Sequence, residues 1–117
     1  MDKKAYEEFL AKYEDNAEVW PYIEEIRNVT SRIRRVFPLE VYPKIHTPMN
    51  APGVKVYLDF EDDPLYPDIL VNIEIYKDRK IEWFIKNRAT KDYYGNEVPE
   101  CLSIAFNDLH KAFEKLK

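Results

Sequence analysis

Glycine and cysteine are scarce in this chain of 117 residues, and their scarcity excludes several kinds of site. The two glycines are too few for a glycine-rich phosphate loop, and neither dinucleotide-binding nor P-loop spacing occurs. The single cysteine, Cys101, cannot form an internal disulfide. Together with His46 and His110 it matches no recognised zinc-ligand spacing. We therefore expect a protein that holds no metal and no other cofactor.

Long apolar runs are also missing from the sequence. No segment approaches the roughly 20 apolar residues that a helix needs to span a bilayer. The first residues lead into an acidic amphipathic segment instead of the apolar core of a signal peptide. With only one cysteine in the chain, these features predict a cytoplasmic protein that has no membrane partner.

Side chains that commonly act as nucleophiles are equally few. The two serines, Ser31 and Ser103, lack the sequence context of a nucleophile elbow. Cys101 and His110 fall in one predicted helix, where their spacing separates them by about 13 Å along the axis. Because no nucleophile is matched with a base, the sequence predicts no catalytic residues and favours a protein that is not an enzyme.

Acidic residues outnumber basic ones, so the net charge is -4 at pH 7 and the pI is about 5.3. Proteins that bind nucleic acid through phosphate contacts usually present a net basic surface. The charge balance therefore favours a protein partner over a nucleic acid.

Apolar residues at helical spacing occupy both ends of the chain. Residues 3–36 contain two such stripes, which predict a helix over 3–14 and a second one over 19–36. Pro21 fits the first turn of the second helix, and Pro38 prevents its continuation. A third stripe predicts a C-terminal helix over 98–117, with Pro99 at its first position.

Between the helical segments, a proline-rich connector (37–53) precedes three apolar/polar alternations within 54–88. The alternations predict strands over 54–60, 69–76 and 80–88 that bury one face of a sheet. Pairing Ile75 with Ile81 and Phe60 with Ile69 keeps every apolar residue on that face. Residues 39–42 are candidates for a short extra edge strand; without it, a strand edge stays open for a second copy of the chain.

The predicted fold is therefore a single α+β domain with the order α-α-β-β-β-α. Its centre is a three-stranded antiparallel meander, and the C-terminal helix packs on one face.

The first candidate site is the loop that joins the first two predicted strands. It combines clustered carboxylates with an aromatic residue fixed between Pro64 and Pro67, which suits an anchor for a partner with a basic surface. The candidate residues are Asp59, Glu61, Asp62, Asp63, Tyr66 and Asp68. Two alternatives stay open: a merely solvated loop, and a cation site at the centre of a small metal-dependent enzyme, although the spacing of an EF-hand is absent.

The second candidate site combines the other face of the sheet with the arginine-rich helix. Aromatic and cationic side chains together can bind single-stranded nucleic acid or a nucleotide, and the candidates are Arg27, Arg34, Tyr57, Tyr76, Phe84 and Lys86. Glu74, Glu82 and Asp59 share that face and would repel phosphates. The structural alternative is that an N-terminal helix covers these aromatic side chains.

Taken together, these features predict a small non-enzymatic protein-binding module, such as a phage-encoded inhibitor, an immunity protein or an adaptor. Nine tyrosines and the acidic loop are the features that favour protein binding.

Overall fold

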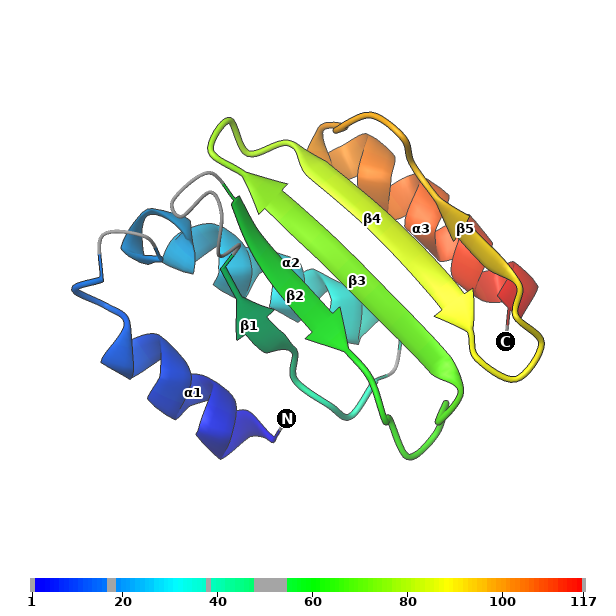
Figure 1. The fold of residues 1–117 in the computed structure, drawn as a ribbon, viewed down its shortest axis with the longest axis horizontal. Helices are drawn as coiled ribbons and strands as arrows, with labels where there is room; N and C mark the ends of the chain where they lie inside the picture. Colours follow the sequence, from blue (N-terminus) through cyan, green and yellow to red (C-terminus); the bar gives the residue numbers. More distant parts are fainter. Residues whose placement is uncertain (1, 17–18, 38, 48–54, 117) are drawn as a thin grey trace.

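The computed structural model describes residues 2–16, 19–37, 39–47 and 55–116, and contains a five-stranded antiparallel sheet with the order β1-β2-β3-β4-β5. The helices α2 and α3 lie behind this sheet, and α1 lies beyond its β1 edge (Figure 1). The helical elements are α1 (Lys3–Lys12), the 3-10 turn η1 (Trp20–Tyr22), α2 (Ile23–Val36) and α3 (Leu102–Leu116). The strands are β1 (Lys44–His46), β2 (Lys55–Phe60), β3 (Ile69–Tyr76), β4 (Ile81–Asn87) and β5 (Tyr93–Gly95). The predicted α+β class is confirmed, and two strands are added to the predicted three.

The apolar/polar alternation correctly predicts the buried face of the sheet. In β2 and β3 every second residue is buried, and the intervening residues are partly exposed. The same holds for the first five residues of β4. The buried set is Val56, Leu58, Phe60, Ile69, Val71, Ile73, Ile75, Ile81, Trp83 and Ile85. Residue 54, which the alternation also assigns to this face, lies outside the described residues, as do 48–53 of the predicted connector.

The predicted register is correct between β3 and β4 and wrong between β2 and β3. Ile75 pairs with Ile81 as expected. Phe60 pairs with Val71, not with Ile69. A shift of two residues leaves every side chain on its face, so the alternation alone cannot exclude it. The loop 61–68 decides the register through contacts with other parts of the fold, which are described below.

Two short edge strands flank the predicted meander. β1 forms at Lys44–His46 and not at 39–42, and it pairs with β2. β5 forms inside a segment whose composition indicates only a polar loop, and it pairs with β4. A Cβ at Gly95 would lie 2.9 Å from the carbonyl oxygen of Trp83, so β5 can approach β4 this closely only with glycine there. The edges that the sequence left open are therefore paired in part, over residues 57–59 of β2 and 84–86 of β4.

The helices cover the buried face of the sheet with their apolar stripes. Ile26, Val29 and Ile33 of α2 are fully buried, and Leu109 and Phe113 of α3 are nearly so. The predicted helical start at residue 98 is wrong. Backbone hydrogen bonds between Ile81 and Glu100 hold the segment before α3 against β4, so the helix begins only at Leu102.

No helix in the described part of the chain combines the length and the apolar character that crossing a membrane requires.

Candidate functional site

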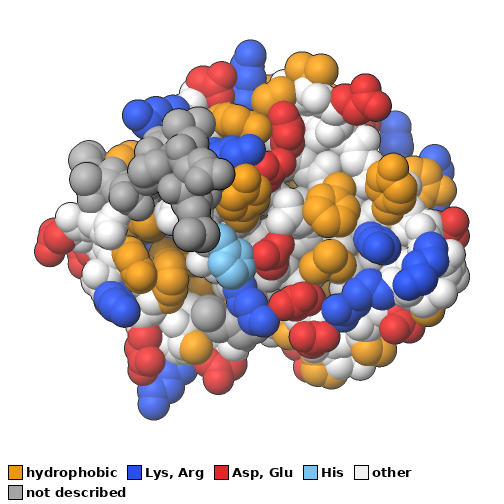
Figure 2. All heavy atoms as spheres, in the orientation of Figure 1, with side chains coloured by type: hydrophobic (Ala, Val, Ile, Leu, Met, Phe, Trp, Pro, Cys, Tyr) orange, Lys and Arg blue, Asp and Glu red, His pale blue; other side chains and the backbone are white. Residues whose placement is uncertain are grey.

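The outer face of the sheet, which is the face turned away from α2 and α3, is uncovered by the described helices (Figures 1 and 2). The alternative in which an N-terminal helix covers its aromatic side chains is wrong for these helices, because α1 lies beyond the β1 edge and α2 packs on the opposite face. Figure 2 shows hydrophobic side chains on the outer face among acidic and basic ones.

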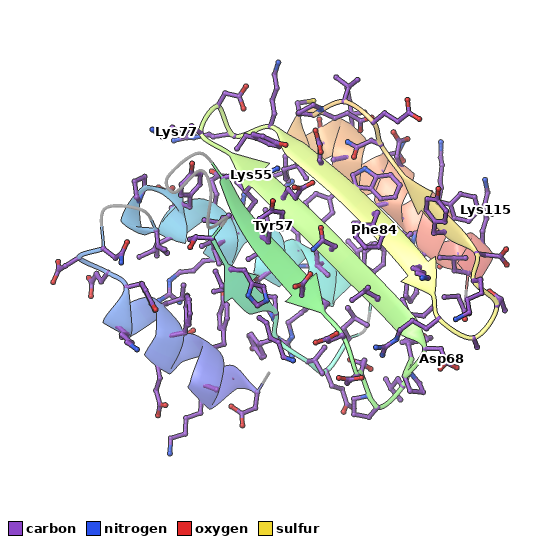
Figure 3. All side chains as sticks on the ribbon, in the orientation of Figure 1. Lys55, Tyr57, Asp68, Lys77, Phe84 and Lys115 are labelled. Carbon is purple, nitrogen blue, oxygen red and sulfur yellow. The ribbon has the colours of Figure 1, made fainter. Side chains whose placement is uncertain are left out.

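Aromatic and apolar side chains extend across the outer face from β2 to β5. Tyr57 lies on β2 and Phe84 on β4, and both project toward the viewer (Figure 3). Leu70 and Lys86 are opposite each other, and Lys86 is opposite Tyr93 on β5. Tyr93 is 69% exposed. The sequence did not indicate Tyr93, because its strand is specified by pairing with β4 and not by an alternation of its own.

The charges at the β2 end of the outer face form one connected group. Lys55 Nζ donates to Glu74 Oε1 at 2.8 Å and to the Tyr76 hydroxyl at 3.3 Å. The same ammonium group lies 5.1 Å from the ring centroid of Tyr57. Its hydrogen bond with Glu74 raises the pKa of Lys55 above its ordinary value, so Lys55 stays charged at all physiological pH values.

Glu82 is the carboxylate of this group that forms no ion pair with the described residues. It pairs directly with Glu74 across β3 and β4, as the predicted pairing of Ile75 with Ile81 requires. Partial burial, and next the neighbouring Glu74, raise the pKa of Glu82. Lys55 is bound to Glu74, and no cation of the described residues lies within ion-pair distance of Glu82. The centre of the outer face thus holds one negative charge more than its own lysine balances.

Two of the four carboxylates in the acidic loop (61–68) pair with nearby cations. Lys44 Nζ contacts Glu61 at 2.8 Å, and Arg88 contacts Asp62 at 3.0 Å. On β2, Asp59 accepts a hydrogen bond from Asn72 and lies 3.1 Å from His46 Nε2. These contacts reduce the negative field that the loop presents to a partner.

Asp63 is buried in the fold. It is only 2% exposed, and its carboxylate accepts hydrogen bonds from the backbone N–H groups of Glu40 (2.6 Å), Val41 (3.1 Å) and Leu65 (2.9 Å). This carboxylate therefore ties the loop to the segment after α2 and is not part of a free acidic surface.

Tyr66 lies inside the loop and not at an exposed tip. Its ring contacts Phe113 of α3 edge-on, with centroids 5.1 Å apart, and it packs against the core. Asp68 is exposed, and its backbone carbonyl accepts a hydrogen bond from the backbone N–H of Arg88. The loop is thus attached to the fold at both its middle and its end.

Arg27 and Arg34 are separated from the other four residues of the predicted nucleic-acid face. The apolar stripe of α2 packs against the buried face of the sheet, so α2 cannot contribute to the outer face. The two arginines instead line a cavity of about 170 Å³, together with Tyr6, Glu7, Thr30, Ser31 and Tyr42. The helical spacing of residues 27, 30, 31 and 34 was the signal in the sequence for this shared face.

No described histidine forms a hydrogen bond with Cys101, so no nucleophile is paired with a base in this part of the chain. Cys101 is exposed, and hydrogen bonds from the backbone of Ile104 and from Ser103 lower the pKa of its thiol. His110 lies 3.7 Å from Glu114 on α3. Within the described ranges, no group of three or more histidine, cysteine or acidic side chains is arranged to hold a metal ion.

Comparison with known proteins gives no relative: no protein-family model, no curated protein and no solved structure shows significant similarity to this chain.

Proposed function

We propose that this chain is a non-enzymatic protein-binding module, an inhibitor or an adaptor, that binds a partner protein through the outer face of its sheet. The observation that carries the proposal is a sheet face, uncovered by the described helices, on which Tyr57, Phe84 and Tyr93 lie among acidic and basic side chains. Aromatic side chains bury a large area with few rotatable bonds, so they are favourable contacts at protein interfaces. The lone exposed Cys101 fits a reducing compartment such as the cytoplasm.

The partner best suited to this face presents an arginine or a lysine surrounded by apolar groups. Such a cation would neutralise Glu82, which Lys55 leaves unpaired, while Tyr57 and Phe84 flank the contact. A nucleic acid is the weaker candidate, because Glu74, Glu82 and Asp59 would place negative charge against its phosphates.

Site-specific photocrosslinking compares the outer face with the acidic loop. In one variant p-benzoylphenylalanine replaces Phe84, and in a control variant it replaces Leu65, which is 56% exposed in the acidic loop. We expect a discrete adduct with one protein of the source cells from position 84 and none from position 65. The adduct protein is then purified, and its binding should be lost in Phe84→Ala.

The absence of an adduct from position 84 would overturn the proposal. So would fluorescence anisotropy that shows saturable binding of short single-stranded RNA at low salt, abolished by Phe84→Ala, since it would assign the same face to nucleic acid. Light scattering of the purified protein tests whether a second copy of the chain binds to the outer face instead.

A further inference from the structure

We infer that the cavity between α1 and α2 binds a small oxyanion of the phosphate class. Its walls carry two arginines, Arg27 and Arg34, and hydroxyl groups from Tyr6, Thr30, Ser31 and Tyr42. The cavity lies on the helical side of the fold, so it is separate from the sheet face proposed for the partner, and each assignment can fail without the other.

Arg34 provides a cation without a matching carboxylate. It donates to the hydroxyl of Tyr42 at 2.7 Å and to the backbone carbonyl of Glu40 at 3.4 Å, and both acceptors are neutral. Its Nε is buried and has no hydrogen-bond partner among the described residues. No described carboxylate lies within ion-pair distance of Arg34. A buried donor that stays unused is costly unless an acceptor reaches it.

Stacking fixes the position of this guanidinium. Its central carbon lies 3.8 Å from the ring centroid of Tyr42, and the ring of Tyr42 packs against that of Tyr6 with centroids 5.0 Å apart. The planar group is therefore held ready before any ligand arrives, which reduces the entropy lost on binding.

Two buried hydroxyl groups line the same cavity. Tyr6 and Thr30 are each 2% exposed, and neither hydroxyl has a hydrogen-bond partner among the described residues other than the facing hydroxyl of the pair. Burial raises the pKa of Tyr6, against the smaller opposing effects of Thr30 and Arg27. Tyr6 is therefore a neutral donor at physiological pH, as an anion site requires.

Arg27 is the cation that an incoming anion can recruit. Its Nη1 contacts both carboxylate oxygens of Glu7 at 3.0 Å, and the two side chains are 48% and 43% exposed. An exposed ion pair of this kind contributes little free energy, so a stronger anion can displace Glu7. With Glu7 displaced, both arginines face the cavity.

The number of donors favours a tetrahedral anion over a carboxylate. The Arg27 and Arg34 guanidinium groups and the Ser31 hydroxyl together carry more donors than two coplanar oxygens can accept, while Arg34 Nε and the hydroxyls of Tyr6 and Thr30 are buried in the cavity wall. A phosphate or phosphate monoester offers at least three strong acceptor oxygens and close to two negative charges. Arginine is the side chain best suited to bind such groups through paired hydrogen bonds.

Isothermal titration calorimetry and amide NMR with inorganic phosphate test the inference, with sodium chloride holding the ionic strength constant. We expect saturable binding at low millimolar phosphate or below, with shifted amides confined to residues that line the cavity. A parallel titration with O-phosphoserine identifies the source of the anion. Tighter binding of the ester indicates an organic phosphate, equal or weaker binding indicates the free ion, and either result supports the site.

Three charge-removing variants locate the binding. Arg27→Gln, at an exposed position, should weaken phosphate binding roughly tenfold, and Arg34→Gln should abolish it. Arg35→Gln is the matched control, because Arg35 is an exposed neighbour on the same helix outside the cavity lining, and it should leave the affinity within about twofold.

If Arg34→Gln fails to fold, Arg27→Gln and Ser31→Ala still decide the question, because both positions are exposed. The inference is overturned if phosphate does not bind saturably at these concentrations. It is also overturned if Arg35→Gln weakens binding as much as Arg27→Gln, since the effect would then be general charge attraction.

Discussion

The acidic loop and the outer face of the sheet both look like interaction surfaces in the sequence, but the fold uses them differently. In the loop, Asp63 binds backbone N–H groups, Tyr66 packs on Phe113, and Glu61 and Asp62 pair with nearby cations. On the outer face, Tyr57 and Phe84 are not covered by the described helices. Three of the four loop carboxylates thus have partners within the fold, whereas on the outer face no described cation forms an ion pair with Glu82.

This difference shows that a cluster of like charges in a sequence is a poor guide to a free surface. What decides the matter is whether the fold supplies partners to each charge. For the loop those partners come from residues distant in the chain, such as Arg88 and the backbone at 40–41, and no local pattern in the sequence reveals them.

The largest expected change in folding free energy distinguishes Asp63 from the adjacent Asp62. Asp63→Asn should destabilise the protein by about 2–4 kcal/mol, because an amide replaces one carboxylate oxygen that accepts buried N–H groups. Asp62→Asn should change stability by less than about 0.5 kcal/mol, because its ion pair is solvent-exposed and asparagine tolerates its positive φ of 59°. Urea unfolding measures both. Equal effects would mean that Asp63 is not the residue that anchors the loop.

The next largest expected change in folding stability comes from comparing Tyr66 in the loop with Phe84 on the outer face. Tyr66→Ala should cost about 2 kcal/mol of folding free energy, because its ring packs on Phe113 and the core. Phe84→Ala should cost less than about 1 kcal/mol, because its ring packs only on the open face beside Gly95. Thermal or urea unfolding of the two variants gives the answer. A larger loss for Phe84→Ala would indicate that this ring serves the fold more than a partner.

The smallest expected effect concerns the repulsion between Glu74 and Glu82. Because the folded state raises the pKa of Glu82, it retains the proton over a pH range in which the unfolded chain has lost it. Folding stability therefore falls as the pH rises through that range. Glu82→Gln should stabilise the protein by about 0.5 kcal/mol at neutral pH, and the gain should vanish below about pH 4.

The exposed Glu8→Gln on α1 is the matched control for this pH comparison, and it should leave stability unchanged at both pH values. If Glu82→Gln gives the same gain at neutral and at acidic pH, the carboxylate pair does not oppose folding.

The sequence allowed the central sheet to be predicted well because β2, β3 and β4 alternate strictly and bury one face. The pairing of Ile75 with Ile81 followed from the short turn between them. The pairing of Phe60 could not be predicted, because a shift of two residues preserves the faces and the loop contacts that choose between registers are tertiary.

The positions of the candidate residues could likewise be predicted only in part. Tyr57, Tyr76, Phe84 and Lys86 lie on one face, as period two requires. Arg27 and Arg34 lie on one helix face, but the sequence could not show that α2 packs behind the sheet or that Tyr6 and Tyr42 complete a cavity with them.

The most direct test of the central claim is calorimetric binding of the partner identified by crosslinking from position 84. The comparison is between Phe84→Ala and the loop double variant Glu61→Gln/Asp62→Asn. Removing an aromatic contact at the centre of an interface costs about 2 kcal/mol or more, which corresponds to a weakening of roughly thirtyfold. We predict that weakening for Phe84→Ala and a change within about twofold for the loop variant, whose charges are already paired. A loss of affinity in the loop variant with none in Phe84→Ala would contradict the account.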